Sequence, residues 1–287
     1  MNRPVRDAIA AMGTALGPDV LAACRAAFAA EQAALAARVP PRAVDCAYGA
    51  HARHRLDLYG GGTAAPVMLF VHGGGFLLGD KGGADSWPNA AVGRWAAEQG
   101  WLGAVMNYRL APDHGWPAGG EDVLAAVDWL AANAAAHGGD PARIVLLGTS
   151  AGAVHLCTAL ALRPGVAVRG CVLLSGLYGY TPLEQRDTLY YGDAALYSQR
   201  MPRATVAETA LPLLVATAEF DPPRFQAEFA GLLAERLERH GALPHAHYAS
   251  GHNHYSMAMH LGTSDRRLAN EIAGFVAGCC GTAEETA

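Results

Sequence analysis

Short apolar runs recur along the chain, and between them lie longer stretches in which apolar residues return every three or four positions. The short runs predict buried strands, and the longer stretches predict helices that pack along one face. We expect strands near residues 43–48, 54–59, 66–71, 102–107, 143–148, 170–174, 212–218 and 243–248. From the third strand onward they alternate with helices expected near residues 88–99, 119–136, 150–162, 223–240 and 257–277. This order predicts an α/β fold, with a mainly parallel eight-stranded sheet, helices on both faces and an antiparallel leading edge.

A serine stands where the fifth expected strand turns into a helix. Ser150 lies in the sequence G-T-S-A-G, directly after the apolar run that ends at Leu147. A serine hydroxyl is a poor nucleophile unless a sharp turn holds it within reach of a base and of a carbonyl carbon, and flanking glycines allow that turn. The helix that follows directs free N–H groups toward a negative oxygen formed there. The pattern therefore predicts a nucleophile elbow.

Three consecutive glycines follow the third expected strand. The sequence H-G-G-G-F occupies residues 72–76, and Ser150 lies 78 residues after its histidine. Glycines in such a loop can leave backbone N–H groups free for a ligand, and a loop at this place in the fold supplies donors to an oxyanion. Taken alone, the loop could also be a glycine-rich turn without a ligand. Because the loop and the elbow meet at the carboxyl edge of one parallel sheet, the two motifs support each other.

A catalytic serine also needs a base and an acid that orients it, and in this fold they follow the serine in the order acid, then histidine. Asp221 comes just after the expected strand 212–218 and before a proline turn, which favours it over the competing carboxylate Glu219. The base is expected in the loop after the last strand, which offers His252 and His254. His254 is favoured because it precedes the expected helix directly, and His252 remains the alternative.

Several further motifs join these residues. They are N-Y-R-L-A-P-D-H at residues 107–114, W-P-A at 116–118, E-D at 121–122 and D-P-A-R-I at 140–144. From about Val44 to Val276 the chain resembles the hormone-sensitive-lipase-like esterases of the α/β-hydrolase superfamily. The resemblance implies a carboxylesterase that needs no cofactor. It implies the following roles: nucleophile Ser150, acid Asp221, base His254, and oxyanion donors at Gly74, Gly75 and Ala151.

Two departures bear on the substrate. Thr149 stands where many of these esterases carry an acidic residue, and the segment between Ser150 and Asp221 is short for a full lid. The sequence G-H-N-H-Y-S at residues 251–256 is more similar to small feruloyl-esterase and arylformamidase relatives. The expected function is a serine carboxylesterase that acts on short-chain or small aryl esters through an acyl-enzyme, and the alternative is an arylformamidase that hydrolyses an amide.

Two segments lie outside the strand–helix alternation. Residues 18–39 predict a helix whose apolar seam would either pack on the body or cover the active-site mouth. Residues 177–210 lack a clear period and are rich in tyrosine, which favours a small cap over the site. We therefore expect a single domain over residues 1–287, with a helical segment at 1–40 and a cap insertion at 177–210. The expected substrate-binding aromatic residues are Phe76, Trp87, Trp116 and Tyr178.

Composition narrows the choice of partners. The chain has 287 residues, 52% of them hydrophobic, and a formal net charge of −5 without a basic stripe, so nucleic-acid binding is not expected. The first residues lack the apolar region of a signal peptide, and we see no apolar run of about 18 residues, so no membrane span is expected. These two features predict a cytoplasmic protein. The six cysteines show no C-x-x-C spacing. The partner expected is a small-molecule ester, and the sequence allows a homodimer.

A metal site is the main rival interpretation of the histidines near the C-terminus. His-x-His pairs can bind a metal, and the following five histidines fall within 16 residues: His245, His247, His252, His254 and His260. That interpretation leaves the elbow and the glycine loop unused, so we expect no metal. A non-catalytic module on the same fold is the other rival, and it would be recognised by a missing triad member. No member is missing in this sequence.

Overall fold

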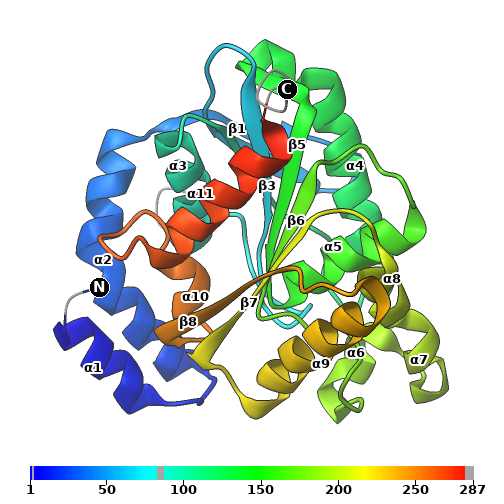
Figure 1. The fold of residues 1–287 in the computed structure, drawn as a ribbon. Coiled ribbons are helices and arrows are strands. Elements are labelled where there is room, and N and C mark those ends of the chain that lie inside the picture. The colour runs from blue at the N-terminus through cyan, green and yellow to red at the C-terminus, as the bar shows by residue number, and fades with distance from the viewer. Residues whose placement is uncertain (2, 83–86, 282–287) are drawn as a thin grey trace.

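The computed structural model of the chain describes residues 1, 3–82 and 87–281. Within this part of the chain, strands form one eight-stranded sheet in the order β1-β2-β4-β3-β5-β6-β7-β8 (Figure 1). β2 is antiparallel to both of its neighbours, and all other pairs are parallel. The α/β fold expected from the sequence is confirmed. The strand bounds are β1 Pro41–Ala47, β2 Arg55–Gly60, β3 Ala65–Val71, β4 Leu102–Met106, β5 Gly139–Thr149, β6 Gly170–Leu174, β7 Leu213–Phe220 and β8 His245–Asn253.

Helices cover both faces of the sheet, and the alternating side chains of the strands explain why. In β3, Val67, Leu69 and Val71 enter one apolar cluster, whereas Met68 and Phe70 enter the other. The first cluster also contains side chains of α4 (Ala118–Asn133), α5 (Ala151–Leu162) and α9 (Pro223–His240). The second contains side chains of α3 (Trp87–Glu98), α10 (Ser256–Met259) and α11 (Arg267–Cys280). Because both faces are buried, the central strands are apolar throughout.

The helix expected over residues 257–277 is wrong in one respect, because two helices occupy this region. α10 ends at Met259 and α11 begins at Arg267. The connecting turn contains Gly262 with φ of +85°, and a Cβ atom there would lie 2.5 Å from a methyl group of Leu35. The glycine thus interrupts the helix and lets α2 pack closely against the turn. The spacing of apolar residues in the sequence does not reveal such a break.

Two helices precede the sheet: α1 (Arg3–Met12) and α2 (Pro18–Arg38). The apolar seam of α2 buries Phe28 and Leu35, and the amide of Gln32 donates to the backbone oxygens of Met259 and Leu261 at 2.8 Å each. α2 therefore packs on the body of the protein. Contrary to the expectation from sequence, α2 has the length and composition of a membrane-spanning helix: it has 21 residues and a window of mean hydropathy 1.3, of which 22% is buried.

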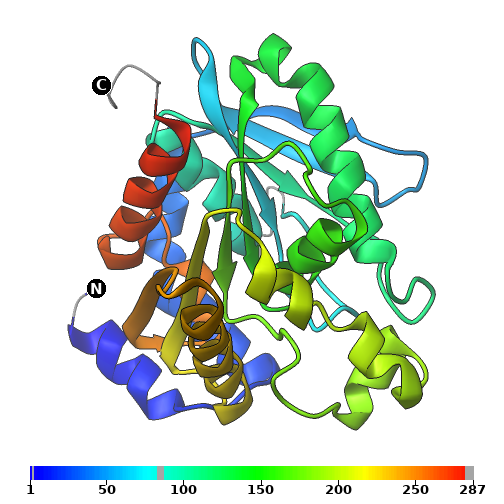
Figure 2. The ribbon, with the colours of Figure 1, turned by 45° about the vertical axis from the view of Figure 1, so that its right-hand side comes forward.

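Residues 177–210 fold into short helices beside α9: α6 (Thr188–Tyr191), α7 (Tyr197–Arg200) and α8 (Arg203–Glu208) (Figure 2). The buried carboxylate of Glu228 in α9 accepts hydrogen bonds from four consecutive backbone N–H groups, those of residues 178–181. Arg224 of α9 forms an ion pair with Asp187 at 2.6 Å. These contacts attach the start of the segment firmly to the helix that follows Asp221.

Candidate active site

Ser150 occupies the turn between β5 and α5. Its backbone has φ of 53° and ψ of −120°, an unusual conformation for a residue with a side chain. The Ser150 N–H donates to the Leu174 oxygen at 2.8 Å, which fastens the turn to the neighbouring strand. The flanking glycine at 152 is required because a Cβ atom there would lie 2.0 Å from the Val71 oxygen. The half-buried hydroxyl is thus held at the carboxyl edge of the sheet.

A chain of hydrogen bonds joins the three side chains predicted as nucleophile, base and acid. His254 Nε2 lies 3.0 Å from Ser150 Oγ, and His254 Nδ1 lies 2.8 Å from Asp221 Oδ1. When Nδ1 carries the proton, it donates to the carboxylate, and Nε2 is free to take the proton of the hydroxyl. The ring of Phe225 lies 4.3 Å from the imidazole, centre to centre. The arrangement can activate a serine for attack on a carbonyl carbon.

Asp221 is fully buried, and its second oxygen is held by three donors. Oδ2 accepts from the hydroxyl of Ser175 at 2.6 Å, the hydroxyl of Thr217 at 2.8 Å and the N–H of Ala218 at 2.7 Å. Burial alone would raise the pKa of Asp221, but the hydrogen bonds from His254, Ser175 and Ala218 outweigh it and lower the pKa. The carboxylate therefore stays ionised and oriented toward the imidazole. Sequence reasoning missed Ser175 and Thr217, because their roles arise only when β6 and β7 pair.

The alternative base, His252, lies elsewhere. β8 continues to Asn253, so His252 belongs to the strand and not to the loop expected from the sequence. Its Nε2 lies 3.3 Å from Asp265 and its Nδ1 lies 3.0 Å from the hydroxyl of Ser256. The competing acid, Glu219, accepts from the hydroxyl of Ser250 and the N–H of residue 251, so it braces the end of β8. Neither residue takes part in the hydrogen-bond chain to Ser150.

The glycine loop after β3 lies against the elbow. A Cβ atom at Gly73 would lie 3.1 Å from the Ser150 Cβ, and one at Gly74 would lie 1.9 Å from the Leu78 oxygen. Gly74 and Gly75 have φ of +134° and +59°. Within the described residues, the N–H groups of Gly74, Gly75 and Ala151 have no hydrogen-bond acceptor. Free donors beside a serine hydroxyl can stabilise the negative oxygen of a tetrahedral intermediate.

Aromatic rings lie next to this loop. Phe76, which has a φ of +70°, stacks in parallel on Tyr190 of α6 at 4.1 Å, and Tyr190 also approaches Nδ1 of His155 through its hydroxyl at 3.2 Å. Trp116 and Tyr191 pack in the same cluster. Tyr190 thus connects the segment 177–210 with both the glycine loop and the helix after Ser150, a role that its place in a tyrosine-rich stretch did not reveal.

Two of the expected substrate-binding residues lie outside this aromatic cluster. Tyr178 is only 1% exposed and packs in the main core with Leu156 and Leu232, and the expectation that it contacts substrate stays a prediction. Its backbone is drawn inward by the buried carboxylate of Glu228. Trp87 packs with the cluster under α1 and α2, and its contact with substrate stays a prediction.

One cluster among the described residues has the composition of a metal site: His252, His260 and Asp265, all buried, with one ligand atom from each within 4.8 Å of the others. The two imidazole rings stack face to face at 3.9 Å, which prevents their lone pairs from converging on one ion. Asp265 is already paired with Arg267 at 2.7 Å. These contacts fit a buried charge network better than a metal site.

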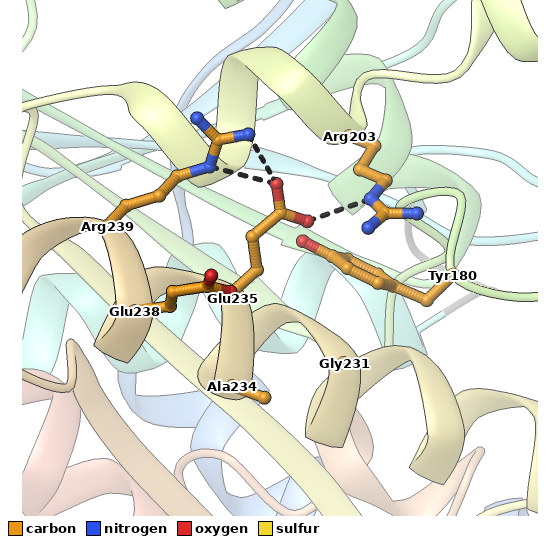
Figure 3. A pocket seen from close by; sticks show the side chains of 7 residues that line it. All are labelled: Tyr180, Arg203, Gly231, Ala234, Glu235, Glu238 and Arg239. Atoms are coloured by element: carbon orange, nitrogen blue, oxygen red, sulfur yellow. Dashed lines mark hydrogen bonds and ion pairs between the residues drawn. The ribbon is translucent and has the colours of Figure 1, made fainter.

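A surface hollow of about 640 Å³ lies over α9, away from the elbow (Figure 3). Neither Ser150, Asp221 nor His254 lines it. Glu235 lies at its centre and pairs with Arg203 and Arg239 at 2.8 and 2.7 Å. Glu235, Arg203 and Arg239 of this hollow therefore neutralise one another.

Comparisons with known proteins agree with this architecture. The family model described as "alpha/beta hydrolase fold" matches residues 68–258, and the chain belongs to this family. Carboxylesterase NlhH of Mycobacterium tuberculosis is 46% identical over 88 residues, 30% of this chain and 26% of that protein. Esterase LipQ of the same organism is 30% identical over 219 residues, 66% of this chain and 51% of that protein. The chain thus matches from about a quarter to about half the length of these relatives.

Solved structures extend the similarity over nearly the whole chain. An esterase of Pyrobaculum calidifontis superposes with a TM-score of 0.62 at 25% identity and covers 97% of this chain and 98% of its own. Esterase LipW of Mycobacterium marinum superposes with a TM-score of 0.69 at 21% identity, with 97% and 96% covered. At 21% identity, the similarity to LipW shows a shared fold only.

Proposed function

We propose that this protein is a serine carboxylesterase. The observation that carries the proposal is the continuous hydrogen-bond chain from Asp221 through His254 to Ser150. Beside it lie three backbone N–H groups that have no acceptor in the part of the chain that the structure describes. The names of the curated relatives, carboxylesterase and esterase, support ester hydrolysis as the activity.

The mechanism follows from these positions. Ser150 Oγ attacks the ester carbonyl carbon while His254 Nε2 takes its proton, and Asp221 stabilises the imidazolium that results. The N–H groups of Gly74, Gly75 and Ala151 bind the negative oxygen of the tetrahedral intermediate. The intermediate collapses with cleavage of the bond to the alcohol oxygen, which takes the proton from His254. Water then attacks the acyl-enzyme with the same base, releases the acid and restores the serine.

We propose small substrates, with short acyl chains or compact aryl groups. The rings of Phe76, Tyr190 and Tyr191 are each less than 5% exposed and pack on one another beside the glycine loop. This dense packing supports a short pocket over an extended acyl tunnel. In the same proposal, residues 177–210 act as the cap over the site.

The alternative is an arylformamidase, which would use the same serine to hydrolyse an N-formyl amide. The two activities are separated by assaying p-nitrophenyl acetate and butyrate beside N-formylkynurenine, with wild-type protein and Ser150→Ala. We expect ester hydrolysis that the substitution abolishes. A kcat/KM for N-formylkynurenine well above that for both esters would favour the formamidase, and no turnover of any of the three would refute both proposals.

We also propose a cytoplasmic enzyme that acts without nucleic acid or membrane. All six cysteines are free thiols, which is usual in a reducing compartment. β8 is an edge strand whose residues 245, 246 and 248 are exposed, which would allow a homodimer, and light scattering on the purified protein would measure the oligomeric state.

A further inference from the structure

A cation from residues 177–210 lies directly against the glycine loop. Arg186, in the short turn Gln185–Asp187, places Nη2 at 2.3 Å from the position that a Cβ atom would take at Gly75. Its guanidinium group therefore touches the residue whose N–H is proposed to bind the oxyanion. The side chain is exposed, so a ligand can reach this group from solvent.

Within the described residues, Arg186 has neither an ion-pair partner nor a hydrogen-bond acceptor. The acids adjacent to it in sequence are unavailable, because Arg224 pairs with Glu184 at 3.2 Å and with Asp187 at 2.6 Å. Arg186 is thus a cation beside the glycine loop, and the acids nearest to it in sequence are already paired with Arg224.

The other arginines of the segment differ from Arg186 in this respect. Arg200 donates to the Tyr191 oxygen and covers the ring of Trp116, and Arg203 pairs with Glu235 (Figure 3). The guanidinium groups of Arg200 and Arg203 are therefore occupied by contacts within the protein. The guanidinium of Arg186, which lies against Gly75, is the one left free to bind a ligand.

We propose that Arg186 binds a carboxylate of the substrate, so that the enzyme prefers esters that carry a carboxylate a few bonds from the scissile carbonyl. This inference rests on the proposed function. The planar guanidinium donates two parallel N–H groups, which match the two oxygens of a carboxylate. Since the carbonyl oxygen is to sit at Gly74 and Gly75, a nearby carboxylate on the same substrate lies within reach of Arg186. Monoesters of short dicarboxylic acids and acylated hydroxy acids or phenol acids have this chemistry.

The test compares each charged ester with a neutral ester of the same framework that lacks the carboxylate. p-Nitrophenyl hydrogen succinate against p-nitrophenyl butyrate places the charge on the acyl side, and 4-acetoxybenzoate against phenyl acetate places it on the leaving group. The proteins are wild type, Arg186→Gln, Arg186→Lys and, as a matched control, Arg25→Gln, which changes an exposed arginine of α2. The neutral esters report the basal activity of each protein.

We expect Arg186→Gln to lower kcat/KM for the charged ester of at least one pair by roughly tenfold, mainly through KM, because the contact is made before and during the reaction. Neutral esters should change less than about twofold, Arg186→Lys should retain part of the preference, and added salt should weaken it in wild type. The pair that responds identifies the side of the ester that carries the charge.

Equal effects on charged and neutral esters, or no effect on either pair, would overturn the inference and leave the proposed esterase intact. A decrease in kcat/KM for the charged ester that is as large in Arg25→Gln as in Arg186→Gln would also overturn it, since the effect would then come from the net charge of the protein. Wild-type protein that hydrolyses none of the four esters would refute the proposed function itself.

Discussion

Removal of one hydroxyl group behind the catalytic acid should slow the reaction without weakening substrate binding. Ser175 donates to Asp221 Oδ2 at 2.6 Å, and both side chains are buried, so solvent does not replace the lost donor. A hydrogen bond to a charged group contributes about 1.5–3 kcal/mol. Thr217 and Ala218 still donate to the same oxygen, so we expect Ser175→Ala to lose the lower part of that range. A loss of about 1.5 to 2 kcal/mol corresponds to a roughly 10- to 30-fold decrease in kcat.

The assay is the hydrolysis of p-nitrophenyl acetate, with kcat and KM determined separately and with circular dichroism to confirm folding. Ser250→Ala is a matched control, because it removes a hydroxyl that donates to the neighbouring Glu219 at 2.8 Å and not to Asp221. We expect the control to retain kcat within about threefold. A folded Ser175→Ala variant with wild-type kcat, or a control that loses as much, would refute the argument that Oδ2 is held for catalysis.

Three further predictions follow from the structure. His254→Ala should lower kcat by roughly 10⁴-fold. His252→Ala should keep most of kcat and lower Tm, because it removes a buried contact with Asp265, and the reverse ranking would contradict the assignment. Burial lowers the pKa of both His155 and His260 to about 3. Below about pH 6.5 the unfolded chain therefore binds protons that the native state does not. As the pH is lowered further, the free energy of unfolding should decrease by about 1.4 kcal/mol per pH unit for each histidine. Urea unfolding at pH 7, 6 and 5 measures this, and stability that is constant or rises on acidification would be contrary to it. With p-nitrophenyl esters of increasing length, kcat/KM should peak at about two to six acyl carbons, and a steady climb to twelve would indicate a long apolar tunnel, at about 0.8 kcal/mol per buried CH₂.

Most of the fold could be predicted because buried parallel strands and amphipathic helices leave strong local patterns. The strand that ends at Thr149 and the helix that begins at Ala151 were both visible as apolar runs on either side of Ser150. The break between α10 and α11 was missed because its cause is the contact of Gly262 with Leu35, more than two hundred positions away in the sequence. Contacts at such separation leave no local period.

The positions of site residues could be predicted where the residue directly follows a strand. They could not be predicted where the role of the residue depends on tertiary packing. Ser150 and Asp221 each follow a strand directly, so their place at the sheet edge could be inferred. Tyr178 was assigned to the substrate pocket from its segment alone, but the carboxylate of Glu228 holds its backbone against α9. Arg186 had no distinguishing sequence signal, since its contact with the glycine loop exists only in the folded chain.

Covalent labelling with a fluorophosphonate tests the central claim most directly, because such reagents react with a serine only when it is activated as a nucleophile. After labelling and proteolysis, mass spectrometry identifies the modified residue. We predict modification of Ser150 in wild type, none in Ser150→Ala, and strongly reduced labelling in His254→Ala. Modification of a different serine, or undiminished labelling of Ser150 when His254 is replaced, would contradict the proposed mechanism.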